Sequence, residues 1–481
     1  MPSASRLRRL CVSLGLVVAL TALGAGAAQA TPYPVLTYGY GNHRGGYDGK
    51  ETSLGTGNAA GLHEVWSVNL HGVTISQPMV VPGVHEGSHV DTLVITGSEN
   101  GAIWAFDAKT GSVVWTRFFG NQHTGCSDLP NGRYGVSGTV DVDPVAQRVY
   151  VAGNDGKLYA LGLASGSILS GWPQTVTKHP GLEHVYSALT RNGTHLYVET
   201  ASYCDVAPYR GRIEEFSTTA HRLIHTWYVD GPHGPSGGGI WGQGGVSVDS
   251  SGNVYTATGN ALASPENLAS ADAVVRLSSS LVRQALDKPP LTGGDVDFGA
   301  SPLLFQPPGC PLEVAVENKS GVLLLYDANS IGSGDIQRLQ VADVNDYEFN
   351  SIPAYDPVTN MVYVTSASDS SDTDIHGNPL YQQGLIAFGI QGDCTLDPTP
   401  AWSQPANLGY EISVSPPTVA NGVVYYGDGG GDQELAFDAA TGAPLWNSGT
   451  TIGGYIFAAP TVDNGNVYVG SWDGHLYKFG T

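Results

Sequence analysis

Three short stretches of this sequence carry residue types that could do chemistry together. The stretch GGGIWGQGG surrounds Trp241 with six glycines, and the segment VYTATGN that follows ends at Asn260. Further on, Asp295 and Asp297 lie two positions apart in GGDVDFGA, and Lys319 lies in ENKSG. A carboxylate can take up a proton, a lysine can stabilise negative charge, and an indole offers a flat apolar surface. Whether these residues act together depends on whether the fold brings them to one place.

Other familiar catalytic motifs do not occur in the sequence. It has no GxSxG, no Walker A sequence and no HExxH, and so lacks the signatures of a nucleophile elbow, a P-loop and a zincin. It also has no CxxC or CxxCH, which argues against a thioredoxin-type pair and a covalently attached haem.

The first thirty residues have the pattern of a secretory signal. A start with three arginines is followed by the apolar run CVSLGLVVALTALGAGA and by the small-residue sequence AQA, which ends at Ala30. The apolar run is short and rich in glycine for a membrane span. We therefore expect cleavage after Ala30 and a secreted, extracellular protein that does not span a membrane.

The charge balance bears on the choice of partner. The chain has 21 Lys and Arg against 43 Asp and Glu, a net charge of -22, and loss of the signal would make it more negative. Such a surface disfavours nucleic acid and anionic membranes. We expect a small-molecule partner, and the sequence does not reveal the oligomeric state.

An internal repeat predicts the fold. LVITGSENGAIWAFDAKTGSVVW recurs as VYVAGNDGKLYALGLASGSILSGW and as VVYYGDGGGDQELAFDAATGAPLW. Each copy gives two strands, a T-G-type turn and a strand ending in Trp, and an alternating run before it adds a fourth strand. Weaker copies between them bring the total to eight units. Periodic four-stranded units predict an all-β fold, an eight-bladed β-propeller.

The two ends of the chain support this count. The final copy stops after its third strand, while LHEVWSVNL near the N-terminus looks like a fourth strand without a blade of its own. We expect this strand to complete the last blade and so remove a free sheet edge. The chain then divides into a signal peptide (1–30), an N-terminal extension (31–61) and the propeller (62–481). The repeated tryptophans are interpreted as packing between blades: Trp66, Trp115, Trp172, Trp227, Trp402 and Trp446.

The blade topology sorts the candidate residues by face. With strands A to D numbered from the axis outward, D-to-A and B-to-C loops lie on one face of a propeller, and the other loops lie opposite. Trp241 and Asp297 fall in D-to-A loops, and Asn260 and Lys319 fall in B-to-C loops. All four are therefore expected on one face, which also carries Asp205 and other acids.

The same sorting predicts the disulfides. Four cysteines remain after loss of the signal, and an even number in an exported chain suggests two bonds. Cys126 and Cys204 fall on the first face, and Cys310 and Cys394 on the opposite face. We therefore predict the pairs 126–204 and 310–394, because the other pairings would join opposite faces.

These segments resemble the quinoprotein alcohol dehydrogenases, eight-bladed propellers that bind pyrroloquinoline quinone and calcium. The A-x-T-G-x-x-x-W repeat is similar to the tryptophan-docking motif of that family, and GGGIWGQGG followed by VYTATGN resembles its quinone-stacking and calcium-binding segment. The resemblance implies that Trp241 and Lys319 bind the quinone and that Asp297 is the catalytic base, with Asp295 beside it. It also implies calcium ligands at Asn260, Asp297 and Asp205. The glycines would leave room for a planar ring above Trp241.

Two functions follow from the resemblance. The first is a secreted dehydrogenase that oxidises an alcohol, a sugar or a polyol and passes electrons to an external acceptor. The second is a non-catalytic extracellular propeller that serves as a binding or scaffold module, similar in architecture to the propeller lipoprotein of the outer-membrane assembly machinery. Two departures from the dehydrogenases motivate the second. The vicinal Cys-Cys pair is missing, and Asp205 is the nearest carboxylate to a missing calcium-binding Glu.

Overall fold

The protein is built from short strands joined by turns and loops. The computed structural model describes Met1 and residues 33–86, 89–125, 132–234, 236–262, 270–293, 295–344, 351–406 and 415–481. Within these ranges the only helices are single 3-10 turns: η1 (Tyr38–Tyr40), η2 (Ala59–Gly61), η4 (Tyr203–Asp205) and η5 (Ile331–Ser333). None of the described helices is long and apolar enough to cross a membrane. The predicted all-β class is confirmed.

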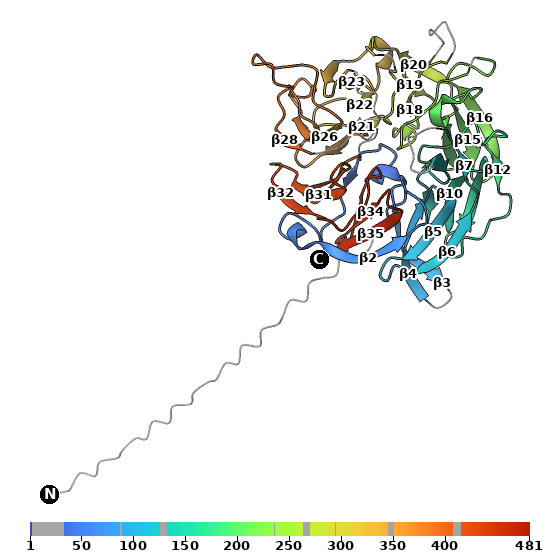
Figure 1. Cartoon of the computed structure of the whole chain (residues 1–481), viewed down its shortest axis with the longest axis horizontal. Helices are drawn as coiled ribbons and strands as arrows, with labels where there is room; N and C mark the ends of the chain where they lie inside the picture. The colour runs from blue at the N-terminus through green and yellow to red at the C-terminus, as the bar shows by residue number, and fades with distance from the viewer. Residues whose placement is uncertain are drawn as a thin grey trace. The chain divides into compact units, whose positions relative to one another are not determined.

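Eight antiparallel blades form the propeller ring (Figure 1). In seven of them the four strands follow in sequence order from the axis outward, and in the last blade the outermost strand comes from the N-terminal part of the chain. Blade 1 consists of β3 (Met79–Glu86), β4 (His89–Gly97), β5 (Ala102–Asp107) and β6 (Val113–Phe118), and blade 2 of β9 (Asp141–Asp143), β10 (Arg148–Gly153), β11 (Lys157–Gly162) and β12 (Gln174–Thr175). Blade 3 consists of β13 (Thr190–Asn192), β14 (His195–Thr200), β15 (Arg212–Ser217) and β16 (Arg222–Tyr228), and blade 4 of β17 (Ser247–Val248), β18 (Val254–Ala257), β19 (Val274–Leu277) and β20 (Arg283–Asp287). A two-stranded ribbon, β7 (Gln122–His123) and β8 (Arg133–Tyr134), lies between the first and second blades in sequence.

The remaining four blades complete the predicted number. Blade 5 consists of β21 (Leu303–Phe305), β22 (Glu313–Asn318), β23 (Val322–Asp327) and β24 (Gln337–Gln340), and blade 6 of β25 (Ala354–Asp356), β26 (Met361–Ser366), β27 (Gly384–Gly389) and β28 (Trp402–Pro405). Blade 7 consists of β29 (Thr418–Ala420), β30 (Val423–Asp428), β31 (Gln433–Asp438) and β32 (Pro444–Asn447), and blade 8 of β33 (Thr461–Asp463), β34 (Asn466–Gly470), β35 (His475–Gly480) and β2 (His63–Asn69). As predicted, β2 pairs with β35 and closes the last blade with a strand from the N-terminal part of the chain.

The repeated tryptophans join neighbouring blades. Trp115, on the outer strand of blade 1, donates its indole N–H to the carbonyl of Leu163 in blade 2 at 2.9 Å. Its ring lies against Gly166 in the T-G-type turn, where a Cβ atom would come within 2.6 Å of the indole. Gly166 also has a φ of +62°, a conformation that side chains disfavour. Trp402 repeats both contacts with Ala439 and Gly442 of blade 7. The docking role predicted for these two residues is confirmed.

The N-terminal extension forms a strap across the inner strands. This strap, Tyr33–Asp48, bonds to the second residue of the inner strand in every blade. In seven blades that residue donates its backbone N–H to the strap, and in blade 3 its carbonyl accepts from Asn42. The eight residues are Val80, Val142, Arg191, Val248, Leu304, Tyr355, Val419 and Val462. The strap ends in β1 (Tyr47–Asp48), which adds to blade 7 as a parallel fifth strand. It therefore links all eight blades.

The strap also fills the axis of the ring. The Tyr38 hydroxyl donates to Oε1 of Gln243 at 3.2 Å, and the N–H of Gly39 donates to Oε1 of Gln77 at 2.8 Å. The guanidinium of Arg44, only 1% exposed, bonds to the Tyr38 carbonyl at 3.0 Å and to the Thr190 hydroxyl. The extension is thus part of the propeller core, which the sequence did not predict.

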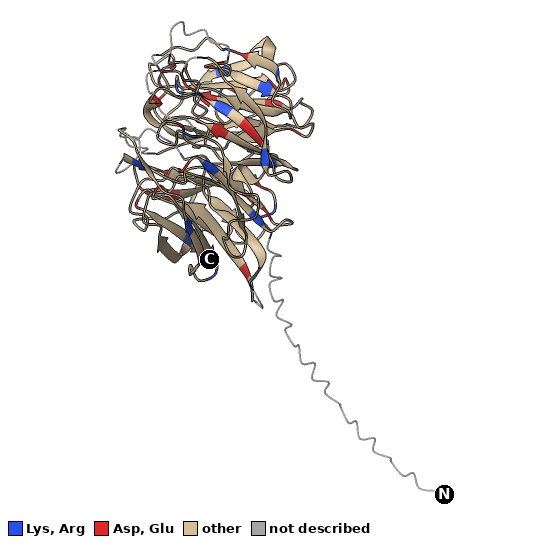
Figure 2. Ribbon diagram, turned by 90° about the vertical axis from the view of Figure 1, so that its right-hand side faces the viewer, with Lys and Arg blue, Asp and Glu red and all other residues tan. Residues whose placement is uncertain are grey.

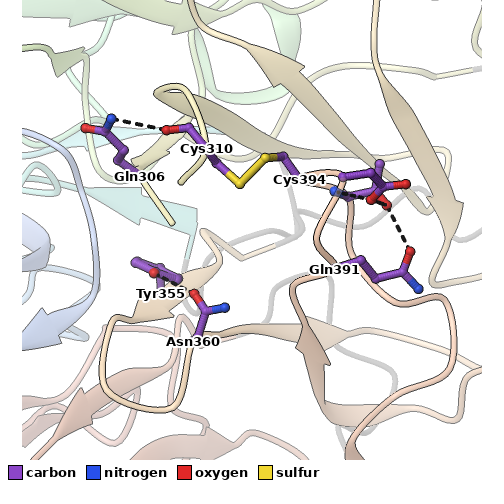
Figure 3. Close-up of a disulfide and its surroundings, with 8 residues drawn as sticks. Gln306, Cys310, Tyr355, Asn360, Gln391 and Cys394 are labelled. Carbon is purple, nitrogen blue, oxygen red and sulfur yellow. Dashed lines mark hydrogen bonds between the residues drawn. A yellow bond between two sulfur atoms is a disulfide. The ribbon is translucent and has the colours of Figure 1, made fainter. Parts of the chain in front are cut away.

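One predicted disulfide is present and joins two blades. Cys310, between β21 and β22, is bonded to Cys394, between β27 and β28, with their Cα atoms 5.7 Å apart (Figure 3). The bond ties blade 5 to blade 6 on the face that the topology predicted. Cys204 is also disulfide-bonded. Cys126 lies outside the described residues, so the pair 126–204 stays a prediction.

Removing the disulfide should destabilise the ring. The two cysteines lie 84 positions apart, so the unfolded chain of a C310S/C394S variant has more conformational entropy than that of the parent. We expect the free energy of unfolding of the variant to be lower by about 2–5 kcal/mol. Urea unfolding of the two proteins without reductant measures the difference. An unchanged midpoint and slope would show that the bond is dispensable.

Candidate active site

The residues singled out from the sequence come together at one end of the ring. Trp241 lies between β16 and β17, and Asp297 lies between β20 and β21. Asn260 follows β18, and Lys319 follows β22 directly. The predicted loop assignment is therefore correct. The contacts described below show that Asp297, Lys319 and Asn260 also converge, rather than merely sharing a face.

An ion pair forms the centre of the site. The ammonium of Lys319 lies 2.9 Å from Oδ2 of Asp295 and 3.2 Å from Oδ2 of Asp297. Lys319 and Asp297 are 7% and 1% exposed, whereas the Asp295 side chain keeps 39% of its surface. Asp297 is thus the enclosed carboxylate and Asp295 the one open to solvent.

Neighbouring backbone groups fix the position of Asp297. The N–H of Asn260 donates to Oδ1 of Asp297 at 2.5 Å, and the N–H of Lys319 donates to its carbonyl at 3.1 Å. The amide of Asn318 donates to the same carbonyl at 3.0 Å. At Gly259 a Cβ atom would lie 2.2 Å from Oδ1, so only glycine permits this approach. Asn318 could not be singled out from the sequence, because its role depends on contact with the loop that joins β20 to β21.

The surroundings shift the ionisation of both partners. Burial raises the pKa of Asp297 to about 7 against the opposing effect of Lys319, and the negative charges of Asp295 and Asp205 add to the rise. Burial alone would lower the pKa of Lys319, but the carboxylates of Asp297 and Asp295 raise it above its usual value. Lys319 therefore keeps its charge near neutral pH, and Asp297 is protonated more readily than an ordinary aspartate.

Asp205 approaches the site from blade 3. Its carboxylate accepts a hydrogen bond from the hydroxyl of Tyr209. Tyr209 is a buried residue that was not singled out from the sequence. Burial raises the pKa of Tyr209, and the negative charges of Asp205 and Asp297 add to the rise.

The glycines around Trp241 serve close packing. A Cβ atom on Gly239 would lie 2.6 Å from Nε1 of Trp241 itself, and one on Gly242 would lie 2.4 Å from Oγ of Ser301. Trp241 is only 5% exposed, and its ring meets Tyr186 edge-on at 6.1 Å. These glycines therefore let the loop pack closely against neighbouring atoms, and the expected room above the indole stays a prediction.

An aromatic cluster surrounds Trp241 at this end of the axis. Its buried members are Val73, Ile75, Tyr134, Tyr186, Ala201, Tyr203, Trp241, Tyr455 and Phe457. A cavity of about 410 Å³ borders the cluster at Val73 and is also lined by Glu99, His123 and Arg133. The volume lies within the range of roughly 300–1,000 Å³ that small-molecule sites occupy.

The site offers oxygen ligands for a cation. Among the described residues, nothing donates a hydrogen bond to the buried Oδ1 atoms of Asn260 and Asp295. Calcium binds such carboxylate and amide oxygens. In the same part of the chain, however, the oxygens of Asp205, Asp295 and Asp297 do not all lie within 4.8 Å of one another. The three carboxylates therefore do not form a compact ligand cluster, and a calcium ion here would need further ligands from water or from a bound group.

Comparison with solved structures places the fold among propeller enzymes and scaffolds. A europium-containing methanol dehydrogenase matches 94% of this chain and 99% of its own, with a TM-score of 0.66 and 15% identity. A quinohemoprotein alcohol dehydrogenase from Comamonas testosteroni matches 94% and 81%, with a TM-score of 0.65 and 16% identity. BamB from Moraxella catarrhalis matches 87% and 100%, with a TM-score of 0.54 and 13% identity. At these identities the likeness shows the fold.

Sequence comparison identifies the family. No curated protein matches the chain. A family model described as outer membrane protein assembly factor BamB matches residues 58–257 and 396–481, more than half of the chain. These residues include the repeats from which the blades were predicted. The chain therefore belongs to the family described as outer membrane protein assembly factor BamB, whose propeller it shares with the quinoprotein dehydrogenases.

Proposed function

We propose that this protein is a quinoprotein-type dehydrogenase that oxidises an alcohol, a sugar or a polyol. The observation that carries the proposal is the enclosed Asp297 held between Lys319 and the Asn260 loop. A buried acid with a pKa near neutrality beside a fixed cation is typical of catalytic sites rather than of solvated loops. The likeness to two alcohol-oxidising propellers supports the same reading.

Each side chain has a defined task in this proposal. Pyrroloquinoline quinone, when bound, supplies the two-electron acceptor. Asp297 removes the proton of the substrate hydroxyl, Lys319 stabilises negative charge on oxygens that face it, and Trp241 gives an apolar floor. Asn260, Asp297 and Asp205 would hold calcium, with Asp295 keeping Lys319 in place.

The setting of the reaction is part of the proposal. The signal-like residues 1–30 favour secretion with cleavage after Ala30, and they lie outside the described part of the chain apart from Met1. Because the sequence has no haem-attachment motif, the electrons would pass to an external acceptor.

Quinone binding tests the proposal directly. Titrating purified protein with pyrroloquinoline quinone and calcium should give saturable binding at micromolar concentrations. The loaded protein should then reduce a dye when it is supplied with a panel of alcohols and sugars. Lys319→Ala should weaken binding at least about tenfold, since a buried charge contact is lost. The matched control is Lys157→Ala, an exposed lysine of blade 2, which should change nothing. Absence of quinone binding at these concentrations would reject the proposal.

The pH profile gives an independent test. The ionised form of Asp297 is the base, and burial raises its pKa to about 7. Activity should therefore rise as the pH passes through about 7 and level off above it, because protonation at lower pH removes the base. A kcat/KM profile from pH 5 to 9 measures this. A rate that stays flat from pH 5 would show that another group takes the proton.

The second candidate function is a binding or scaffold module. The observation that favours it is the match to the BamB family model, together with the likeness to the BamB structure. In that case the protein would bind neither quinone nor calcium, and Lys319→Ala would alter stability alone. The titration above separates the two functions.

A further inference from the structure

A second polar cavity lies between blades 2 and 3. It has a volume of about 220 Å³, and its lining includes Thr177, Lys178, Arg210, Arg212, Glu214 and Tyr228. The volume is below the roughly 300–1,000 Å³ of pockets for drug-sized ligands, so it suits a molecule about the size of a monosaccharide. The proposed function does not use these residues.

The floor of this cavity is a built, buried charge network. The guanidinium of Arg212, 4% exposed, donates to Oε1 of Glu214 and to the Val176 carbonyl, each at 2.8 Å, and forms an ion pair with Oε1 of Glu183 at 3.1 Å. Glu214 is 5% exposed, and its other oxygen, Oε2, is buried and accepts no hydrogen bond from the described residues. A buried carboxylate oxygen without a donor costs free energy. The floor therefore contains one acceptor without a donor among the described residues.

The rim of the cavity is basic. Its exposed basic residues are Lys178, His179 and Arg210. Neither Lys178 nor Arg210 forms an ion pair with another described residue. This is unusual in a chain with about twice as many acidic as basic residues, whose Lys and Arg positions are sparse and scattered over the ribbon (Figure 2). The guanidinium of Arg210 also donates to the Pro232 carbonyl at 2.8 Å. Two cations that form no ion pair with a described residue, at the mouth of a small cavity, favour an anionic group on the ligand.

We infer that this cavity binds a small polyhydroxy carboxylate of the sugar-acid class. The carboxylate would pair with Lys178 and Arg210, and a hydroxyl would donate to Oε2 of Glu214. A hydroxyl suits this position better than an ammonium, because a second cation beside Glu214 would lie close to the guanidinium of Arg212. Thr177 and Tyr228 offer further hydroxyl partners on the walls. The inference stands without the quinone chemistry.

Calorimetric titration of the full protein, without quinone, tests the inference with sodium gluconate as the probe. We expect gluconate to bind with a dissociation constant below about 1 mM. Glucose, which lacks the carboxylate, and acetate, which lacks the hydroxyls, should each bind at least about tenfold more weakly. Glycine should bind no better than acetate.

Matched variants locate the binding. A K178A/R210A variant should weaken gluconate at least about tenfold, and Glu214→Gln should weaken it because the amide nitrogen presents no acceptor. The control K157A/R222A removes the same charge from exposed positions elsewhere and should leave binding unchanged, as should Lys319→Ala. Any of four results would overturn the inference. Acetate and gluconate bind equally well, glycine binds more tightly than acetate, the two double variants weaken gluconate binding equally, or gluconate does not bind in the millimolar range. These outcomes are independent of quinone binding at the Asp297 site.

Discussion

Replacing Asp297 with asparagine should lower dye-linked alcohol oxidation by about two to four orders of magnitude. General-base catalysis contributes about that much, and the amide cannot take up the proton. Asparagine keeps the volume of the side chain and can still accept from the backbone N–H of Asn260, so the fold should survive. The measurement is kcat/KM with quinone present, together with the thermal unfolding midpoint.

Asp295 provides the matched control for this substitution. It contacts the same lysine at 2.9 Å but is open to solvent, with 39% of its side-chain surface exposed. Asp295→Asn should therefore lower activity less than about tenfold, through a weaker hold on Lys319. A larger loss for Asp295→Asn than for Asp297→Asn would reverse the assignment of the base. Equal losses with lowered unfolding midpoints in both variants would show a structural role only.

Removing the strap, residues 33–48, should abolish cooperative folding of the propeller. Without it, eight inner-strand backbone groups, one in each blade, lose their partners. Each buried backbone group left unsatisfied costs about 1–3 kcal/mol, so eight of them rival the ~5–15 kcal/mol that holds a typical fold together. Near-UV circular dichroism and thermal scanning measure the loss. Adding the peptide of residues 33–50 in trans should restore part of the transition.

A single substitution tests the same role more gently. Arg44→Ala removes a buried guanidinium that bonds to Tyr38 and Thr190, and we expect a loss of roughly 3 kcal/mol. The control Arg222→Ala lies exposed on β16 and should stay within about 0.5 kcal/mol of the parent. A strap-deleted protein that unfolds at the parent temperature would show that the blades close without it.

The repeat pattern was enough to predict most of the fold. Strand, turn and tryptophan recur in the sequence because each blade needs the same local solution, and the docking of Trp115 on Gly166 shows why the T-G-type turn belongs to the pattern. The closing strand β2 could be predicted because the last copy is visibly incomplete. The strap could not be predicted, since Tyr33–Asp48 has no repeat and no periodicity. Its partners are backbone groups of strands up to several hundred residues away.

The candidate site shows the same division between sequence and tertiary structure. The loop order in the sequence was sufficient to place Asp297, Lys319 and Asn260 on one face, because propeller topology fixes which loops share an end. Which carboxylate is enclosed was not encoded locally: Asp295 and Asp297 are equivalent in GGDVDFGA. The family resemblance favoured Asp297 as the base, but only the tertiary structure shows the difference in exposure, by burying Asp297 against the loop of Asn260.

The sequence by itself determined the fold class, the number of blades, their closure and the face on which the candidate chemistry lies. These features follow from short-range patterns repeated along the chain. The tertiary structure alone decided the exposure of each aspartate, the closing of the axis by the strap and the contacts made by the glycines around Trp241. Those features depend on which distant segments lie against one another, and burial and unsatisfied hydrogen-bonding groups are properties of that packing.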